Sequence, residues 1–410
     1  MEPTRIATAR ARRVLRALVA GAALAGCTVG ASGTSGASGA SGASGAPGRV
    51  RTAPSTAAPS PPTAPANTDI AAPPAASRMF AFYYLWWDAA HWRARLGPSY
   101  PFTEVRSPLP AKLGFNGCNP VSLYPGNQLT DVSAPLYDQS DPARIANDVR
   151  EAASAGLAGF AVAWAGTGQA GQSASSSTLN ARLAALVSAV EAYDAAGGRF
   201  KLWVSYMSSS RIRSEQAMNN DFGYLWAAYG ASPAFDRSNG GRETVILMGS
   251  RKYPLGVLEQ LSGAWRRHFY LVGDENWRTW NPSRGAVFDA DQYYWSSEPP
   301  SVASYAKIAS LAAMVRSERN PDGSTKQFFS PLAPGYDKQL AGGTNCVPRA
   351  GGQTMRDLYT GNAAARPDAW LVISWNEITE GTYVLPLERY GTQSLSTLTS
   401  IISGAARGEA

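Results

Sequence analysis

Histidine and cysteine are scarce in this chain of 410 residues, which contains two of the former and three of the latter. A histidine-rich zinc site, or a metal cluster held by cysteine and histidine, needs more ligands than the chain can bring together. We therefore expect no metal ion, and nothing else in the sequence indicates a cofactor. Charged residues are also few, at 16%, whereas hydrophobic residues reach 44%. These proportions exclude a largely disordered polyelectrolyte and suffice for a full hydrophobic core.

Positive charge is missing from the part of the chain that should fold. The formal net charge is +7, but residues 1–77 alone contribute +5 of it. A nucleic-acid-binding protein concentrates lysine and arginine on its folded domain to neutralise phosphates. The sequence therefore predicts no nucleic-acid partner.

Residues 1–26 have the pattern of an export signal. The segment from Arg5 to Arg16 contains five arginines and forms a positively charged start. It leads into an apolar run from Val14 to Ala25, which is too short to span a bilayer. The run ends in Leu-Ala-Gly before Cys27, which resembles a bacterial lipobox, where the cysteine takes a diacylglycerol and becomes the new N-terminus. We expect a protein lipid-anchored through Cys27 to the outer face of the cell membrane. The alternative is an ordinary secretory signal with a chance cysteine.

Residues 27–77 read as a disordered linker, because Ala-Ser-Gly repeats over 31–46 are followed by a stretch rich in Pro, Ala, Ser and Thr. The remaining residues, 78–410, form the predicted folded domain, which we expect to be a monomer. Its two cysteines, Cys118 and Cys346, lie in loops rich in Gly, Asn and Pro. In an exported protein two such thiols most simply form a disulfide with each other, although two free thiols are the alternative.

From residue 78 onward, apolar runs of strand length alternate with helical patterns. Eight strands that are apolar on both faces and alternate with helices predict a parallel sheet closed into a (β/α)₈ TIM barrel. Segment 274–285 is only weakly helical, and 88–140 reads as one long loop. The predicted helices cover Pro142 to Gly156 and residues 178–196, 213–229, 255–266, 301–318, 352–364 and 393–404. The predicted strands are Met79–Trp86, Gly159–Trp164, Phe200–Tyr206, Thr244–Met248, His268–Val272, Ala286–Asp289, Gln327–Pro331 and Trp370–Trp375.

In such a barrel the chemistry belongs at the C-terminal ends of the strands. Carboxylates and aromatic residues with few histidines, cysteines or lysines are typical of a glycosidase, because carboxylates supply acid–base chemistry and aromatic rings hold the sugar. The predicted substrate-binding residues at these ends are Tyr84, Trp86, Trp87, His91, Trp164, Tyr206, Asp274, Tyr293, Trp295, Tyr336, Asp337 and Asn376.

The last predicted strand carries a motif. Residues 373–382 read Ile-Ser-Trp-Asn-Glu-Ile-Thr-Glu-Gly-Thr, which resembles the Trp-Asn-Glu-x-x-Glu-Gly-Thr signature of glycoside hydrolase family 99. Four further segments resemble the family in the same order, so that the resemblance spans about residues 79–390. They are Phe82–Trp87 with His91-Trp92, Tyr137–Pro142, Ala155–Trp164 and Pro334–Asp337.

This resemblance implies a retaining (β/α)₈ hydrolase of internal α-mannosidic bonds in a polysaccharide. It makes Glu377 the base that deprotonates the sugar 2-hydroxyl and Glu380 the general acid and then base. We accordingly expect a raised pKa for Glu380, in a water-poor pocket near Trp375, and an ionised Glu377. Ile378 and Thr379 stand where the family usually has an aromatic residue and a histidine. The alternatives are a hydrolase of α-1,3-glucan, as in the related family 71, or of another α-glycan, and a non-catalytic glycan-binding lipoprotein.

Two other patterns suggest different chemistry and are given less weight. Residues 166–171 match GxGxxG after a strand, but the helix begins too late for a dinucleotide site, which predicts a flexible loop. Asp289-Ala290-Asp291 spells the DxD of metal-dependent glycosyltransferases, yet no Rossmann-like half accompanies it. We expect these two aspartates to be strand-end carboxylates that face the cleft or form a salt bridge.

Replacing the predicted lipidated residue tests the anchor. We expect Cys27→Ser to release the exported protein from membranes, because no acyl chains would then be attached. Membrane fractionation combined with intact-mass measurement reports this directly. Unchanged membrane association, with no change in mass beyond the substitution, would contradict a lipid anchor at Cys27.

Overall fold

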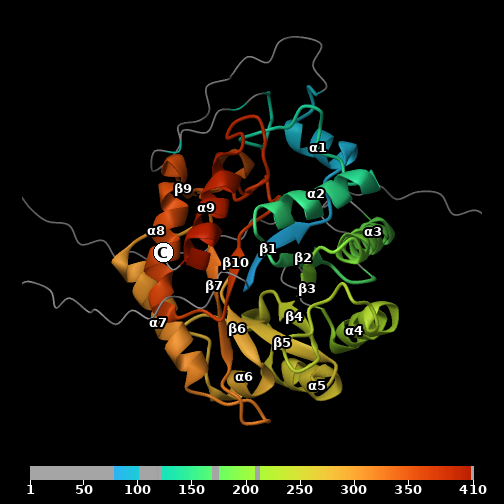
Figure 1. Cartoon of the computed structure of the whole chain (residues 1–410), viewed down its shortest axis with the longest axis vertical. Coiled ribbons are helices and arrows are strands. Elements are labelled where there is room, and N and C mark those ends of the chain that lie inside the picture. The colour runs from blue at the N-terminus through green and yellow to red at the C-terminus, as the bar shows by residue number, and fades with distance from the viewer. Residues whose placement is uncertain are drawn as a thin grey trace, which may run out of the picture. The chain divides into compact units, whose positions relative to one another are not determined.

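The computed structural model describes residues 78–100, 118, 122, 124–168, 175–207 and 213–407. The predicted signal, Cys27 and the linker lie outside these described residues. Eight parallel strands close into a barrel in which each strand pairs with the next along the chain and the last pairs with the first (Figure 1). This confirms the predicted (β/α)₈ barrel. The strands are β1 (Met79–Tyr84), β2 (Gly159–Trp164), β3 (Lys201–Tyr206), β4 (Glu243–Leu247), β5 (Phe269–Asp274), β6 (Ala290–Gln292), β7 (Gln327–Leu332) and β10 (Ala369–Val372).

Helices connect the strands on the outside of the barrel (Figure 1). They are α1 (Ala89–Leu96), α2 (Pro142–Ser154), α3 (Ser176–Ala195), α4 (Glu215–Tyr229), α5 (Leu255–Trp265), α6 (Pro282–Val287), α7 (Val302–Arg316), α8 (Gln353–Asn362) and α9 (Gln393–Arg407). Short 3₁₀ turns cover Ser250–Lys252, Gln339–Ala341, Ala350–Gly352 and Ala363–Ala365. Among the described residues, none of these helices is both long enough and apolar enough to cross a membrane.

Two elements differ from the prediction because helix caps decide the local structure. The sixth strand is Ala290–Gln292 and not 286–289, since Asn281 accepts a hydrogen bond from Arg284 N and Pro282 opens a helix that runs to Val287. The segment predicted as one long loop also contains α1. There, Asp88 caps the helix by accepting from His91 N at 2.8 Å. Both helices are short, which makes their apolar periodicity weak.

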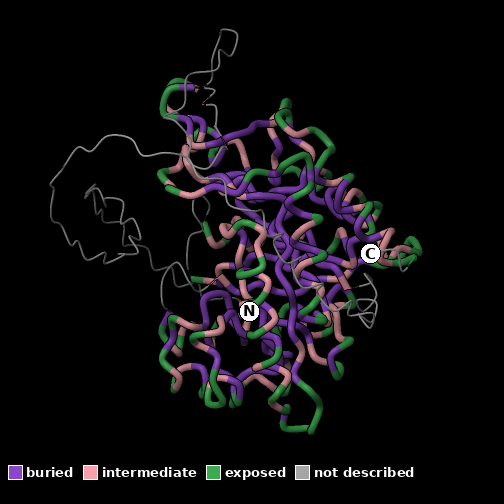
Figure 2. Tube along the Cα trace, turned by 90° about the vertical axis from the view of Figure 1, so that its left-hand side faces the viewer, coloured by how far each residue is buried: buried purple, intermediate pink, exposed green. Residues whose placement is uncertain are grey.

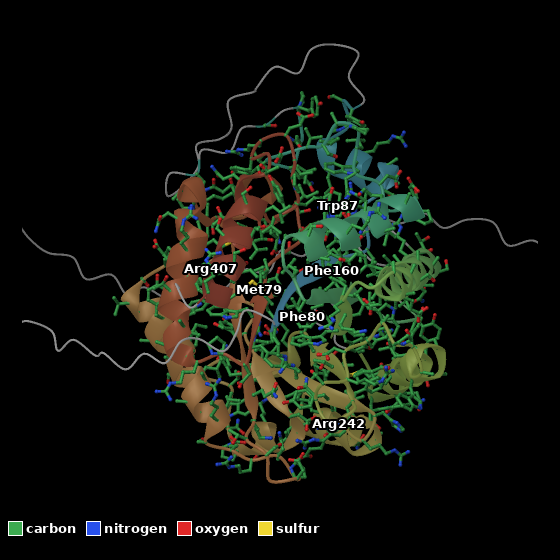
Figure 3. The ribbon with its side chains drawn as sticks, in the orientation of Figure 1. Met79, Phe80, Trp87, Phe160, Arg242 and Arg407 are labelled. Atoms are coloured by element: carbon green, nitrogen blue, oxygen red, sulfur yellow. A yellow bond between two sulfur atoms is a disulfide. The ribbon has the colours of Figure 1, made fainter. Side chains whose placement is uncertain are left out.

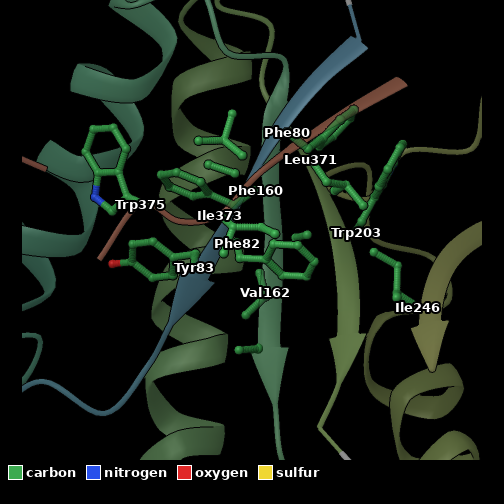
Figure 4. Packing of buried hydrophobic residues seen from close by; sticks show 14 of the residues in the cluster. Phe80, Phe82, Tyr83, Phe160, Val162, Trp203, Ile246, Leu371, Ile373 and Trp375 are labelled. Atoms are coloured by element: carbon green, nitrogen blue, oxygen red, sulfur yellow. The ribbon is translucent and has the colours of Figure 1, made fainter. Parts of the chain in front are cut away.

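Aromatic side chains fill the barrel and the layer around it. Inside, Phe80 stacks on Trp203 with ring centroids 3.9 Å apart, and Trp203 in turn lies 4.9 Å from Phe329. These three residues come from β1, β3 and β7, which agrees with the layers that alternate strands build in such barrels. Phe160, on β2, packs instead against Tyr83 and Trp375. Figure 4 shows this packing, and in Figure 2 the buried parts of the trace run through the middle of the folded part while exposed parts lie around the outside.

A disulfide joins Cys118 to Cys346, with the two Cα atoms 6.2 Å apart. Cys346 begins β9 (Cys346–Val347), which pairs antiparallel with β8 (Tyr336–Asp337) in a two-stranded sheet after β7. The bond spans 228 residues of sequence and ties the segment after β1 to this small sheet.

Removing the disulfide should lower the free energy of unfolding. A crosslink over so long a stretch restricts the unfolded chain strongly, and natural disulfides contribute about 2–5 kcal/mol. Denaturant unfolding of the Cys118→Ser/Cys346→Ser double variant should show this loss. Peptide mapping without reductant should find the linked peptides in the wild type. Two alkylatable thiols in the exported wild-type protein would contradict the bond.

Candidate active site

A tight turn at the end of the last strand carries both candidate catalytic carboxylates. β10 ends at Val372, after which the chain folds back on itself. Ser374 N donates to Thr382 O at 2.6 Å, and Thr382 N donates to Glu377 O at 3.2 Å. Because the turn closes between these residues, Glu377 and Glu380 lie together at the C-terminal end of the barrel, as the motif predicts.

The turn rests on the small sheet formed by β8 and β9. Asp337 N donates to Glu380 O at 2.8 Å, and an Arg349 guanidinium nitrogen donates to Gly381 O at 2.9 Å. Gly381 has a φ of 65°, and a Cβ atom there would lie 3.0 Å from the backbone of Asp337. Only glycine therefore allows this turn to approach β8 without strain. Asp337, predicted to bind substrate, contributes its backbone to this contact.

Asn376 anchors the other side of the turn to the first strand. Its side-chain oxygen accepts from Tyr84 N at 2.8 Å, and its Nδ2 donates to Tyr84 O at 2.9 Å and to the Tyr137 hydroxyl at 3.1 Å. Its backbone oxygen accepts from Trp87 Nε1 at 2.6 Å. Asn376 and Trp87 are fully buried. These hydrogen bonds position the turn that carries Glu377, and neither Asn376 nor Trp87 has exposed surface in this structure.

The two carboxylates have different surroundings. Glu377 is buried, and its side chain accepts from Thr379 N at 3.1 Å. Burial and the negative charge of Glu380 raise the pKa of Glu377 to about 8. Glu380 is more open, with 26% of its side chain exposed, and accepts a charge-assisted hydrogen bond from Lys338 Nζ at 3.2 Å. The burial expected around Glu380 is therefore found around Glu377, where it favours the protonated form of that carboxyl.

Three tyrosines surround the carboxylate pair. Burial raises the pKa of Tyr84, Tyr294 and Tyr336, and the charges of Glu377 and Glu380 raise it further in each case. The hydroxyls of Tyr84 and Tyr294 lie 3.0 Å apart. One hydroxyl of this pair donates to the other, so one proton remains for a second acceptor such as a substrate oxygen.

Tyr294 is missing from the predicted site, although its neighbours Tyr293 and Trp295 are included. Its position directly after β6 was the one sequence feature that could have indicated it. Position alone does not tell which of these three consecutive side chains turns toward Glu377 and Glu380. Asp274, predicted to bind substrate, instead holds this segment. Its carboxylate accepts from Tyr294 N at 3.1 Å and pairs with Arg251 at 2.8 Å, and it is buried. Asp274 is therefore a positioning residue.

Two further predicted contacts are enclosed by the protein. Trp164 Nε1 donates to Asn180 Oδ1 at 2.7 Å, and the Tyr206 hydroxyl donates to Asp221 Oδ2 at 2.6 Å. Both Trp164 and Tyr206 are fully buried. Their polar atoms are hydrogen-bonded within the protein and their rings have no exposed surface, so the structure does not bring either residue to the surface of the candidate site.

His91 is also fully buried, between the rings of Trp86 and Trp87. Within the described residues neither ring nitrogen has a hydrogen-bond partner, and burial lowers the pKa of His91 to about 4. A contact between His91 and sugar is thus not available here. Trp86 is buried too and packs against Tyr84 in a tilted arrangement, with ring centroids 4.5 Å apart. Tyr293, Trp295 and Tyr336 are only half-buried.

The DxD pattern does not form a metal site. Asp289 precedes β6, at the N-terminal end of the barrel, and pairs with Arg242 at 3.1 Å and with Arg266 at 2.9 Å. Asp291 lies buried within β6, and burial raises its pKa. Arg242, the partner of Asp289, lies well apart in Figure 3 from Trp87, which follows the C-terminal end of β1. Across the described part of the chain, no cluster of three or more His, Cys, Asp or Glu residues could hold a metal ion.

Two cavities lie close to the segment that follows β10, but neither is lined by Glu377 or Glu380. One of about 70 Å³ lies beside Gly381, Tyr336 and Arg349. The other, of about 390 Å³, lies between residues 133–137 and 385–388. Since Glu377 is buried and Glu380 is partly exposed, a ligand would reach the pair from the side of Glu380 and Lys338.

No family model and no curated protein sequence matches this chain. Solved structures do match its fold. The GH99 endo-alpha-mannosidase from Bacteroides thetaiotaomicron has a TM-score of 0.59 at 17% identity, covering 82% of this chain and 99% of that one. Its complex with bis-tris-propane has a TM-score of 0.58 at 16% identity, covering 82% and 98%. A glycoside hydrolase-like protein has a TM-score of 0.52 at 13% identity, covering 66% and 89%. This chain therefore shares their barrel fold.

The raised pKa of Glu377 predicts a pH-dependent stability. The folded state holds this proton up to about pH 8, whereas an ordinary glutamate loses it near 4.5, so the stabilisation is complete below 4.5 and disappears as pH rises through 8. Glu377→Gln removes the titrating group. The wild type should lose stability between pH 5 and pH 8.5, and the variant should not. We therefore expect the free energy of unfolding of the variant, measured relative to the wild type, to be higher at pH 8.5 than at pH 5 by on the order of 1–3 kcal/mol. Melting curves at both pH values test this.

The matched control is Glu259→Gln, on the exposed face of α5. Its stability relative to the wild type should not change between the two pH values. A Glu377→Gln curve parallel to that of the wild type would mean that Glu377 ionises normally.

Proposed function

We propose that this chain is a glycoside hydrolase that cleaves internal α-mannosidic bonds of a polysaccharide with retention of configuration. The observation that carries the proposal is the pair Glu377 and Glu380 on one turn at the C-terminal end of a (β/α)₈ barrel, where such barrels place their chemistry. The motif around the pair resembles glycoside hydrolase family 99. The fold is also that of an enzyme described as a GH99 endo-alpha-mannosidase.

In the first step the substrate supplies its own nucleophile. The carboxylate of Glu377 removes the proton of the sugar 2-hydroxyl, and that oxygen attacks the anomeric carbon to form a 1,2-anhydro sugar. The bond from the anomeric carbon to the leaving oxygen breaks, and the carboxylic acid of Glu380 protonates that oxygen. In the free protein burial favours the protonated form of Glu377, while Glu380 accepts a charge-assisted hydrogen bond from Lys338. The reactive form therefore requires that this proton has moved from Glu377 to Glu380 and that Glu380 has given up its contact with Lys338.

The second step returns both protons. The carboxylate of Glu380 takes a proton from water, whose oxygen attacks the anomeric carbon and opens the three-membered ring. The oxygen on C2 recovers its proton from Glu377 and becomes a hydroxyl again, so both glutamates return to their starting states. Two inversions at the anomeric carbon give net retention. The ordinary spacing rule for two catalytic carboxylates does not apply, because the nucleophile belongs to the sugar.

The burial of Glu377 suits this role. A carboxylate with a pKa near 8 is a stronger base than an ordinary glutamate, and a general base works best when its pKa is close to the working pH. The paired hydroxyls of Tyr84 and Tyr294 provide a hydrogen-bond donor beside both carboxylates. Such a donor would stabilise charge on the sugar oxygens as the bonds change.

We also propose that the enzyme works outside the cell, lipid-anchored to the outer face of the membrane through Cys27. The support is the arginine-rich start, the short apolar run and the cysteine that follows small residues. A linker of about 50 residues would hold the barrel away from the membrane, where it could meet an extracellular polysaccharide.

Two glutamine variants test the mechanism. Glu377→Gln should lower kcat/KM about 10²–10⁴-fold on every substrate, because the 2-hydroxyl can no longer lose its proton. Glu380→Gln should lower it comparably on α-mannan but less on activated aryl mannosides, whose leaving group needs no protonation. A 2-deoxy substrate should be inert even with the wild-type enzyme. Product sizing and NMR of the released anomer complete the assay.

Glu259→Gln is the matched control and should retain wild-type rates. Full activity in both Glu377→Gln and Glu380→Gln, or efficient cleavage of the 2-deoxy substrate, would contradict the mechanism. Cleavage of α-1,3-glucan in place of α-mannan would change the substrate class. Binding of glycan without hydrolysis would identify a non-catalytic glycan-binding protein.

A further inference from the structure

Three aromatic rings form a compact group outside the carboxylate site. Trp277 lies between β5 and α6, and Tyr293 and Trp295 lie between β6 and α7. The ring centroid of Trp277 is 5.6 Å from that of Tyr293 and 5.3 Å from that of Trp295, and the last two are 5.5 Å apart. All three side chains are only half-buried. We refer to these three residues as the aromatic cluster.

The aromatic cluster shares a backbone segment with the carboxylate site. Tyr293, Tyr294 and Trp295 are consecutive, and the middle residue reaches Tyr84 beside the carboxylates. Its two neighbours instead contact Trp277. The strands from β5 through β6 and β7 to β10 all pair in parallel, so the C-terminal ends of β5 and β6 open on the same face of the barrel as the catalytic turn. A chain bound at the carboxylates and extending over the end of β6 would therefore meet the aromatic cluster.

Polar groups surround these rings in the way that a ligand site requires. Lys307 Nζ lies 5.4 Å from the ring centroids of both Trp277 and Trp295, and it pairs with Glu298 at 3.6 Å. The side chains of Lys307 and Glu298 are 39% and 37% exposed. Apolar rings with a few accessible hydrogen-bonding groups at their edge are typical of small-molecule and carbohydrate sites. The three rings pack against the core on one side, but they are not enclosed by it, and their remaining surface is accessible.

We propose that the aromatic cluster binds pyranose rings of the polysaccharide, at positions removed from the bond that is cleaved. This inference rests on the proposed function. A pyranose has an apolar face of C–H groups, whose positive hydrogens are attracted to the negative face of an aromatic ring, and a rim of hydroxyls. The rings of the aromatic cluster match the first feature, and Lys307 and Glu298 match the second. Binding there makes the enzyme favour long chains over short substrates.

The test compares long and short substrates in the full-length protein. We expect Trp277→Ala and Trp295→Ala to lower the ratio of kcat/KM on α-mannan to kcat/KM on an activated aryl disaccharide about tenfold, mainly through KM. Trp277→Phe retains an aromatic ring and should recover most of the ratio. The matched control is Trp226→Ala, a partly exposed tryptophan on α4, for which the ratio should stay at the wild-type value.

Binding without turnover provides a second readout. In the Glu377→Gln background, Trp277→Ala should reduce retardation by α-mannan in affinity electrophoresis, whereas Trp226→Ala should not. Melting curves verify that each variant is folded. An unchanged ratio and unchanged retardation in folded Trp277→Ala and Trp295→Ala proteins would overturn the inference and leave the proposed function intact. If the wild-type protein neither binds nor cleaves any α-glycan, the proposed function fails, and the inference fails with it.

Discussion

The hydrogen bonds between Asn376 and the backbone of Tyr84 hold the candidate site together. A single amide both donates to and accepts from the end of β1, while the backbone oxygen of Asn376 accepts from Trp87. All of these atoms are buried, so each bond has little competition from water, and losing one would leave a buried polar group unpaired. The barrel closes between β1 and β10, and the same contact orients the turn that carries Glu377. The strands themselves pair through Met79–Ala81 and Trp370–Val372, and Asn376 extends this contact from the barrel to the turn.

Much of this arrangement follows from local sequence patterns. The predicted strand Gly159–Trp164 has the bounds of β2, because an apolar run buried on both faces has a clear signature. The sixth strand was placed wrongly, since three residues are too few for a pattern and the cap at Asn281 turns the preceding apolar residues into a helix. Strand position predicted which residues gather at the barrel mouth. It did not predict which of them, such as Trp164, are covered by side chains from elsewhere in the chain.

Electrostatics within the site could not be predicted from the motif. The spacing of Glu377 and Glu380 indicates a pair, but their environments come from segments distant in sequence. Lys338, which follows β8, donates to Glu380, whereas burial and the nearby charge of Glu380 act on Glu377. Tertiary packing therefore raises the pKa of Glu377 and leaves Glu380 partly exposed beside Lys338. This difference matters for the proposed mechanism, in which the buried carboxylate is the base and the open one faces the leaving group.

A shared barrel does not by itself imply a shared substrate, because the same fold supports many chemistries through the loops at its C-terminal face. In this chain the turn that carries Glu377 and Glu380 and the neighbouring aromatic segment differ in how firmly they are held. The turn is rigidly held by Asn376, Gly381 and the β8 backbone, as a bond-breaking site requires. The half-buried rings after β5 and β6 pack against the core on one side and have accessible surface on the other. If they bind glycan as proposed, substitutions among them should alter which glycan is bound while the hydrogen bonds that hold the carboxylate pair are retained.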